Sequence, residues 1–272
     1  MTGAATTIPF YDAEAAARAT PMPALIAALR CAFASGEYHA PSRLAADMGG
    51  ASLLVMPAWK GSERVGTKIV TVDPRTRPSI QSTYILSDRV SGRPIAAIDG
   101  AVLTRRRTAA GSVLAASQLP RPPSVTLLVI GTGALNGPVI AGYSSAFTIN
   151  QILVWGRDAD KAEAAARAAR AQGYPAAAIA TVEGGLAAAD IVSAATLATE
   201  PLIAGAALRP GMHIDLIGAF RPDMCEADAE AFARARVFVD THEGAMEEAG
   251  DLLQAIAAGA IGADAVEADL AA

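Results

Sequence analysis

Short apolar runs alternate with alanine-rich stretches across the middle of the chain. The first run, residues 125–130, reads VTLLVI and leads directly into a glycine turn. Such a run is typical of a parallel strand that is covered on both faces. Further apolar runs follow, with helical spacers between them, at 152–155, 178–182, 190–196, 213–218 and 237–241. This succession predicts an α/β fold with a doubly wound parallel sheet of the Rossmann type.

The first part of the chain has a different pattern, in which short strands alternate with turns. It predicts helices over 13–35 and 104–119, and between them an antiparallel sheet with strands at 52–57, 65–72, 82–87 and 95–98 and a turn at 88–94. Prolines at 120, 122 and 123 then break the chain, because proline cannot continue a helix. We therefore expect residues 1–121 to form a smaller α+β domain and residues 122–242 to form the Rossmann domain.

Charge and composition exclude several classes of partner. The net charge is −5, and the 22 basic residues are scattered except for the run Arg105-Arg106-Arg107, so no nucleic-acid partner is expected. The cysteines, Cys31 and Cys225, and the histidines, His39, His213 and His242, show no metal-ligand spacing, so no metal site is expected. Both cysteines are predicted to be reduced packing residues.

The segment from Pro122 to Gly156 contains no charged residue, and its length is sufficient for a membrane span. Its glycines and the sequence Asn136-Gly137-Pro138 divide it into strand, turn, helix and strand instead, so no membrane association is expected. The N-terminus has no basic region followed by an apolar core. We therefore expect no signal peptide and a cytoplasmic protein.

The turn after the first parallel strand reads Gly131-Thr132-Gly133. Two glycines here allow the backbone to approach a pyrophosphate at the N-terminus of the next helix, where free amide groups and the helix dipole favour anions. The third glycine of the usual G-x-G-x-x-G pattern is replaced by Asn136, and Gly137-Pro138 follow it. Because Asn-Gly-Pro is a turn signal, we expect the helix to start late or to be distorted.

The second parallel strand ends at Trp155-Gly156-Arg157. An acidic residue usually stands here when the ribose of the cofactor carries a free 2′-hydroxyl, whereas arginine suits a 2′-phosphate. The sequence therefore predicts NADP(H) before NAD(H). Asp158 and Lys161 follow closely and keep NAD(H) possible.

Three basic residues of the first domain, Arg43, Lys68 and Arg107, stand where their side chains are able to converge on a cleft. Lysine in the middle of an apolar strand is costly to bury unless it is paired or functional. The alternative interpretation places Lys68 on the solvated face of a half-exposed sheet. Spacing alone leaves both interpretations open.

Taken together, these motifs occur in the order and spacing of a known family. The chain resembles the ornithine cyclodeaminase and mu-crystallin family over roughly residues 40–255, in the segments GTKIV (66–70), DG (99–100), RTAA (107–110), GTG (131–133), WGR (155–157), ADIV (189–192), PGMHI (210–214), GA (218–219), VD (239–240) and EAGD (248–251). The resemblance implies a dimer-forming domain built from both ends of the chain, so that residues 243–272 return to the domain of residues 1–121. It also implies a homodimer.

By the same resemblance, Arg43, Lys68 and Arg107 hold the carboxylate of a small amino- or imino-acid substrate. A guanidinium binds a carboxylate through two parallel hydrogen bonds, and a lysine adds a point charge. Thr108 is expected near the nicotinamide and Arg157 at the adenosine end of the cofactor. The full set of expected cofactor-binding residues is Gly131, Thr132, Gly133, Arg157, Thr108, Thr196 and Gly218.

The chain departs from the family pattern at three places. The family favours Gln and Ala at 135 and 136 and often His at 139, whereas this chain has Leu135, Asn136 and Val139. The family also continues through a further helix beyond the position of Ala272, so we expect either that the sequence is truncated or that the first domain is incompletely covered. The third place is Phe220, where ornithine cyclodeaminases and related alanine dehydrogenases carry an acidic residue shortly after the Gly218 turn.

Phe220 decides which reaction the sequence favours. Cyclodeamination of ornithine requires a proton-transferring group near Cα, whereas reduction of a preformed cyclic imine requires delivery of a hydride. We therefore expect an NAD(P)H-dependent reductase of small cyclic imino acids such as Δ1-pyrroline-2-carboxylate. Ornithine cyclodeaminase remains an alternative if Asp223, Glu226 or Asp228 supplies a carboxylate. A non-catalytic family member that binds only cofactor or ligand is the other alternative.

Overall fold

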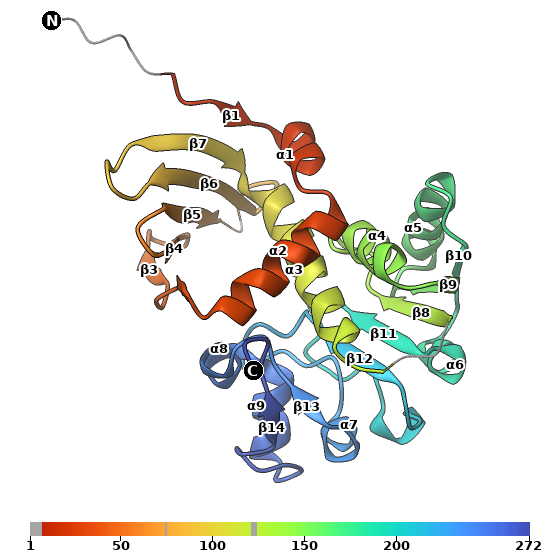
Figure 1. Ribbon diagram of the computed structural model, residues 1–272. Helices are drawn as coiled ribbons and strands as arrows, with labels where there is room; N and C mark the ends of the chain where they lie inside the picture. The colour runs from red at the N-terminus through yellow and green to blue at the C-terminus, as the bar shows by residue number, and fades with distance from the viewer. Residues whose placement is uncertain (1–6, 74, 121–123) are drawn as a thin grey trace, which may run out of the picture. The chain divides into compact units, whose positions relative to one another are not determined.

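The computed structural model describes residues 7–73, 75–120 and 124–272 (Figure 1). The chain divides by its internal contacts into two compact units, residues 1–107 and 108–272, and the division falls inside helix α3, Gly100–Ser117. The proline break expected at 120–123 lies mostly outside the described residues. The expected domains, 1–121 with 243–272 and 122–242, stay a prediction.

The first unit is built on a mainly antiparallel sheet. Its central order is β1-β7-β6-β5-β4-β2, with β3 also paired to β4; among the described strands of this sheet, β1 and β7 are parallel and the other pairs are antiparallel. The strands are β1 (Phe10–Tyr11), β2 (Tyr38–His39), β3 (Leu44–Asp47), β4 (Ser52–Lys60), β5 (Arg64–Val72), β6 (Ile80–Asp88) and β7 (Pro94–Asp99). The predicted antiparallel sheet is therefore present, and each of its predicted strands overlaps one of β4 to β7.

The helix predicted over residues 13–35 is in fact two helices, α1 (Ala13–Ala19) and α2 (Met22–Ser35). Pro21 separates them in an extended conformation with ψ 139°, and a second proline stands at the start of α2. Proline has no N–H to donate and disfavours a helical conformation in the residue before it. Helix α3 begins earlier than predicted, because the Asp99 carboxylate accepts the backbone N–H of Val102.

The second unit contains a five-stranded parallel sheet in the order β10-β9-β8-β11-β12. Its strands are β8 (Val125–Ile130), β9 (Ile149–Trp155), β10 (Ala176–Ala178), β11 (Ile191–Ala194) and β12 (His213–Leu216). Besides the end of α3, the helices described in this unit are α4 (Asn136–Ala146), α5 (Ala159–Ala171), α6 (Val182–Ala188), the 3-10 turn η1 (Gly205–Ala207), α7 (Ala229–Arg234), α8 (His242–Glu248) and α9 (Gly250–Ala257). The strand order reverses direction between β8 and β11. In such sheets ligands bind outside the carboxyl ends of the strands at this point.

The predicted fold class is confirmed, but two strands differ from the expectation. The segment expected as a strand at 178–182 contributes only Ala178 to β10, because Thr181 caps helix α6 through its hydroxyl. The sixth expected strand does not join the main sheet. Its residues Val237–Phe238 form β13, which pairs with β14 (Val266–Ala268) in a separate two-stranded sheet.

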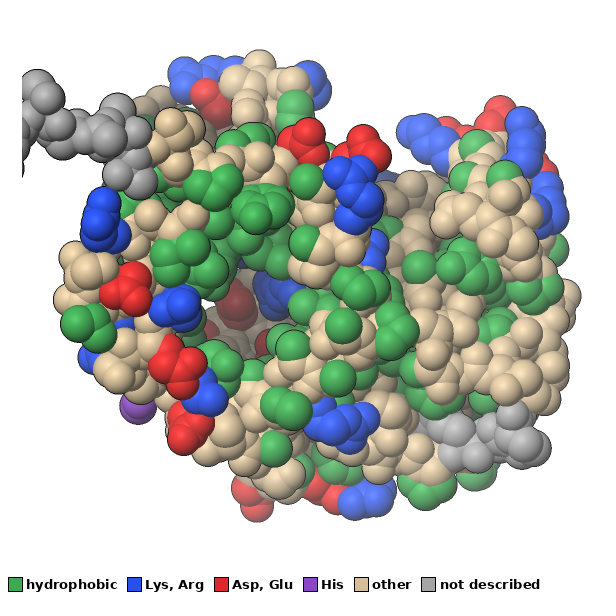
Figure 2. All heavy atoms as spheres, turned by 45° about the horizontal axis from the view of Figure 1, so that its top comes forward, with side chains coloured by type: hydrophobic (Ala, Val, Ile, Leu, Met, Phe, Trp, Pro, Cys, Tyr) green, Lys and Arg blue, Asp and Glu red, His purple; other side chains and the backbone are tan. Residues whose placement is uncertain are grey.

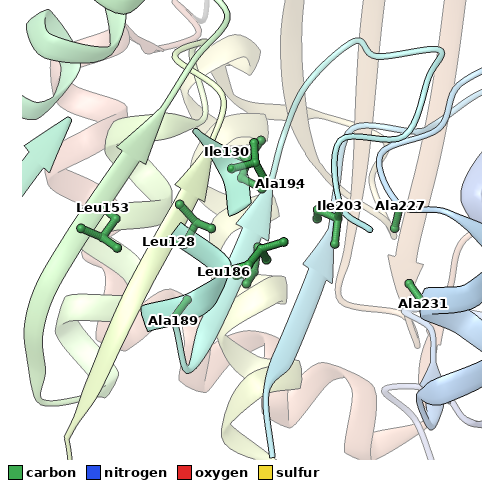
Figure 3. Packing of buried hydrophobic residues seen from close by; sticks show 11 residues of the cluster. Leu128, Ile130, Leu153, Leu186, Ala189, Ala194, Ile203, Ala227 and Ala231 are labelled. Carbon is green, nitrogen blue, oxygen red and sulfur yellow. The ribbon is translucent and has the colours of Figure 1, made fainter. Parts of the chain in front are cut away.

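One continuous apolar core stabilises the parallel sheet. Figure 3 shows Leu128 and Ile130 of β8, Leu153 of β9 and Leu186 of α6 in this cluster, and all four are nearly or fully buried. Both faces of a parallel strand are covered, which explains the continuous apolar run in β8. This packing fixes the ends of β8 and β11, where the sequence predicts a ligand.

Within the described residues, no helix has the length and apolar character that a membrane crossing requires. The uncharged segment at 122–156 instead supplies β8, α4 and β9 of the second unit.

Candidate active site

The glycine turn after β8 has the geometry of a close-approach turn. Gly131 has φ +121°, and a Cβ at this position would lie 2.8 Å from the carbonyl oxygen of Ala195, so only glycine fits. A Cβ at Gly133 would meet nothing within 4 Å. Gly131 is therefore required by the backbone itself, whereas Gly133 leaves open space beside the turn.

Helix α4 follows this turn without delay. It begins at Asn136, and Val139 already donates to the carbonyl oxygen of Leu135 at 2.9 Å. The expectation of a late or distorted helix was therefore wrong. Pro138 stands in the first helical turn, where the missing N–H has no partner to lose. Asn136 is buried and donates through Nδ2 to the carbonyl oxygen of Gly131 at 2.9 Å, which fixes the turn.

Arg157 follows β9 and is exposed. Among the described residues, no hydrogen bond or ion pair engages its guanidinium. Its neighbour Asp158 is the N-cap of α5 and accepts the backbone N–H of Lys161 at 3.1 Å. That hydrogen bond lowers the pKa of the Asp158 carboxyl. Asp158 is thus engaged in capping, and Arg157 is the charged side chain that this loop offers to a ligand.

Thr132 and Gly156 bring the loops after β8 and β9 together. A Cβ at Gly156 would lie 2.7 Å from Cγ2 of Thr132, so the glycine makes room for the threonine side chain. The expected cofactor residues Gly131, Thr132, Gly133 and Arg157 consequently lie at one edge of the sheet, at the carboxyl ends of β8 and β9.

Thr196 and Gly218 occupy matching positions beyond β11 and β12. A buried carboxylate joins them: Glu226 Oε1 accepts from the backbone N–H of Thr196 at 2.6 Å and from its hydroxyl at 2.7 Å, and Oε2 accepts from Gly218 N–H at 2.6 Å. Burial raises the pKa of Glu226 to about 7. Sequence reasoning used Glu226 as part of the family resemblance and as a possible substitute base, and it missed this contact.

The carboxylates proposed to replace an acid at position 220 are engaged elsewhere. Phe220 itself is 47% exposed. Asp223 forms an ion pair with Arg221 at 2.9 Å, and Asp228 caps helix α7 and accepts the N–H of Gly205. Glu226 accepts hydrogen bonds from Thr196 and Gly218, so each of the three carboxylates has a partner within the protein.

The basic residues of the first unit centre on strand β5. Alternate residues of a strand share one face, and the neighbours of Lys68 on its face, Gly66 and Val70, are both buried. Lys68 therefore lies on the covered face of the sheet rather than on a solvated one. Burial, and then the charges of Arg107 and Arg43, lower the pKa of Lys68 to about 8. Both arginines thus lie close enough to Lys68 for their charges to act on it.

Tyr84 is a residue of this site that sequence reasoning missed. It pairs with Lys68 across the β5–β6 ladder, and a Cβ at Gly66 would collide with its hydroxyl. The phenol therefore lies over Gly66, on the same face as Lys68. Burial raises the pKa of Tyr84, so its hydroxyl stays protonated at neutral pH. Thr108 follows Arg107 in α3 and is half-buried.

Known proteins share this arrangement. A parallel sheet in this order, with a glycine turn at its switch point, defines a Rossmann-type dinucleotide-binding unit. The sequence signature of the ornithine cyclodeaminase/mu-crystallin family matches residues 13–271. The chain belongs to this family, and the family predicted from its motifs is confirmed.

Individual relatives cover most of the chain. Delta(1)-pyrroline-2-carboxylate reductase of Paracoccus denitrificans is 38% identical over 224 residues, which make up 80% of this chain and 71% of that protein. Ketimine reductase mu-crystallin of Rattus norvegicus is 33% identical over 204 residues, with shares of 73% and 64%. The structure of Thermococcus litoralis Delta(1)-pyrroline-2-carboxylate reductase in complex with NADH and L-proline is 25% identical and covers 97% of this chain and 85% of that chain, with a TM-score of 0.90.

Proposed function

We propose that the chain is an NAD(P)H-dependent reductase of small cyclic imino acids of the Δ1-pyrroline-2-carboxylate type. The observation that carries the proposal is the position of Lys68 on the covered face of strand β5, where burial and then the charges of Arg107 and Arg43 lower its pKa. A buried ammonium group near further positive charges favours the binding of an anionic substrate. The named activity of two relatives, at 38% and 33% identity, supports the same substrate class.

The roles of the basic residues follow from the shape of an α-imino acid. Its planar carboxylate suits a bidentate guanidinium, which we assign to Arg107 with Arg43 assisting, while Lys68 adds a point charge. Binding of the carboxylate favours the protonated form of Lys68. Fixing the carboxylate also orients the imine carbon, and orientation of this kind supplies much of the rate in an enzymatic transfer.

The second unit supplies residues that fit a dinucleotide. The open space at Gly133, the positive end of the α4 helix dipole and the exposed Arg157 favour the binding of phosphate groups. A bound reduced nicotinamide supplies the hydride. We infer a preference for NADP(H), with NAD(H) as the second choice, because Arg157 suits a 2′-phosphate and Asp158 is engaged as a helix cap.

Reduction fits the loop after β12 better than cyclodeamination does. Release of ammonia and closure of a ring require a group that transfers protons near Cα. Phe220 is unable to do this, and Asp223, Glu226 and Asp228 are engaged in other contacts. A cyclic imine that arrives protonated needs only the hydride and a bound carboxylate.

The experiment supplies two substrates in parallel. We expect Δ1-pyrroline-2-carboxylate with excess NADPH to give proline with equimolar cofactor oxidation, and ornithine with catalytic cofactor to give no ammonia. Ammonia and proline from ornithine without net consumption of cofactor would favour the cyclodeaminase instead. Binding of neither cofactor would favour a non-catalytic member of the family.

We further propose that the protein acts as a homodimer in the cytoplasm. Figure 2 shows hydrophobic side chains gathered on one face of the molecule. Separately, the exposed apolar residues of the first unit include Phe10, Leu44, Ile80 and Val90. Exposed apolar surface of this kind marks an interaction site, and a second copy covers it symmetrically. Sedimentation should give twice the chain mass of 27.6 kDa, and a monomer at micromolar concentration would contradict the dimer.

Cys31 and Cys225 are free thiols, as a reducing compartment allows.

A further inference from the structure

Glu226 is one of the largest fully buried side chains, with 0% of its surface exposed. Its carboxylate has no ion-pair partner within the described residues. Instead it accepts three hydrogen bonds, two from Thr196 and one from the backbone N–H of Gly218. A carboxylate that is buried without a cation is costly, and an apolar side chain of similar size would fill the same space. This cost indicates that the carboxylate of Glu226 is needed for the positions in which it holds its hydrogen-bond partners.

The contacts of Glu226 fix two loops at once. Strands β11 and β12 are paired in register at Ala194 and Leu216, and Thr196 and Gly218 each follow two residues later. The loops approach so closely that a Cβ at Gly218 would lie 2.2 Å from the carbonyl oxygen of Thr196. One carboxylate therefore holds both backbones at the carboxyl ends of these strands.

Further hydrogen bonds hold the backbone at Glu226 in place. Oδ1 of the buried Asp251 accepts the backbone N–H of Glu226 at 2.6 Å and that of Ala227 at 2.9 Å. The carbonyl oxygen of Glu226 accepts from the N–H groups of Leu202 and Ile203. These bonds leave the carboxylate little freedom to move away from Thr196 and Gly218.

The same loop also contacts the glycine turn. The carbonyl oxygen of Ala195, which precedes Thr196, lies where a Cβ at Gly131 would come within 2.8 Å. Glu226 is thus linked through Thr196 and Ala195 to the turn that follows β8. The ends of β8, β11 and β12 form one edge, and this edge is the proposed binding site of the dinucleotide.

We propose that Glu226 is a positioning residue for the cofactor, because its carboxylate fixes the Thr196 and Gly218 backbones in the conformation that the dinucleotide requires. The inference rests on the proposed function, in which this edge binds NAD(P)H. Glu226 itself contacts no reacting atom. Its loss is expected to weaken cofactor binding while the binding of the imino acid in the first unit is unchanged.

The test compares Glu226→Gln with Glu230→Gln, an exposed control that pairs with Arg234 on helix α7. The introduced amide keeps the size of the side chain but turns an N–H toward one of the two loops, where it meets another donor. We expect faster amide hydrogen exchange at Thr196 or Gly218 in the cofactor-free protein. We also expect a rise of about tenfold in Kd and KM for NADPH and NADH, the factor that loss of one hydrogen bond to a charged group produces. The kcat and the KM for Δ1-pyrroline-2-carboxylate should stay close to those of the control.

Asp251→Asn is the second variant, for use if Glu226→Gln does not fold. It weakens the support of the Glu226 backbone and should change the same quantities in the same direction, by less. Unchanged exchange and unchanged cofactor affinity in a folded variant would overturn the proposal, as would a parallel rise in KM for the imino acid. If the unmodified protein binds neither dinucleotide, the proposed function fails. Hydrogen exchange then tests the role of Glu226 separately. Unchanged exchange in Glu226→Gln would show that Glu226 does not fix the Thr196 and Gly218 loops, whereas faster exchange would show that it does and that only the proposed cofactor binding is wrong.

Discussion

The side-chain amide of Asn136 donates a hydrogen bond of 2.9 Å to the carbonyl oxygen of Gly131. This contact occurs where the usual dinucleotide motif has a glycine, and it joins the first residue of α4 to the first residue of the turn. Asn136 therefore departs from the motif in residue type, yet its side chain stabilises the turn through this hydrogen bond.

Replacing Asn136 by alanine should lower the free energy of unfolding by about 1 kcal/mol, the usual effect of losing one hydrogen bond of this kind. Asn150→Ala is the control, because the exposed Asn150 donates only to Ser124 Oγ, and its loss should cost less than about 0.5 kcal/mol. Urea denaturation of both variants measures the difference. Equal effects would show that the Asn136 contact contributes nothing specific to the turn.

Arg157→Ala should weaken NADPH binding by about tenfold or more and leave NADH binding nearly unchanged. The physical reason is the loss of a charge-assisted hydrogen bond to a 2′-phosphate, which NADH lacks. Fluorescence titration with both cofactors measures this. Lys161→Ala, on the exposed start of α5, is the matched control and should have a smaller effect. An unmodified protein with equal affinity for both cofactors, insensitive to Arg157→Ala, would reject the preference.

Lys68→Met and Arg107→Met should each raise KM for the imino acid by about tenfold or more, since each removes a partner of the substrate carboxylate. Cofactor affinity should not change. The unmodified protein should also lose substrate affinity as the pH rises above about 8, because Lys68 then gives up its charge. Lys68→Met should lack this loss. Lys60→Met, which removes contacts with Glu37 and with the ring of Tyr38, serves as control. An unchanged KM for the imino acid in both variants would show that Lys68 and Arg107 do not bind the substrate carboxylate.

Stability should fall as the pH rises from about 4.5 to about 7. Burial raises the pKa of Glu226 to about 7, so the folded protein binds a proton there that the unfolded chain, with a pKa near 4.5, has released. Folding is therefore favoured most at the acidic side of this window and levels off above pH 7. Burial likewise raises the pKa of Asp215 and of Asp251, which adds to the same trend.

Glu226→Gln should flatten this dependence, because glutamine does not titrate. Thermal unfolding between pH 4.5 and 8 measures it. Carboxyls with lowered pKa, such as those of Asp73 and Asp88, act in the opposite direction and only near or below pH 4. An equal slope in the unmodified protein and in Glu226→Gln would show that Glu226 carries its charge throughout this range.

Local patterns predicted most of the second unit correctly. The apolar run of β8 and the turn that follows it depend on burial on both faces and on the freedom of glycine, and both are properties of neighbouring residues. The start of α4 was predicted wrongly. Asn-Gly-Pro is a turn signal in isolation, but the amide of Asn136 reaches back to Gly131, a contact that composition does not reveal.

Long-range contacts account for what the sequence did not predict. Glu226 contacts Gly218, 8 residues before it, and Thr196, 30 residues before it, and the pairing of β11 with β12 brings Thr196 and Gly218 together. Tyr84 joins the face of Lys68 through the register of β5 and β6, which a single sequence does not specify. The signal available beforehand was Gly66, the small residue that makes room for the tyrosine ring.

The most direct test of the proposed reaction follows the hydride itself. Δ1-pyrroline-2-carboxylate is incubated with NADPH that carries deuterium at both C4 positions of the nicotinamide, and the proline is analysed by mass spectrometry. The account predicts one deuterium at Cα of each proline and one NADPH oxidised for each proline formed. Proline without deuterium, or no turnover of the imine although the cofactor binds, would contradict it.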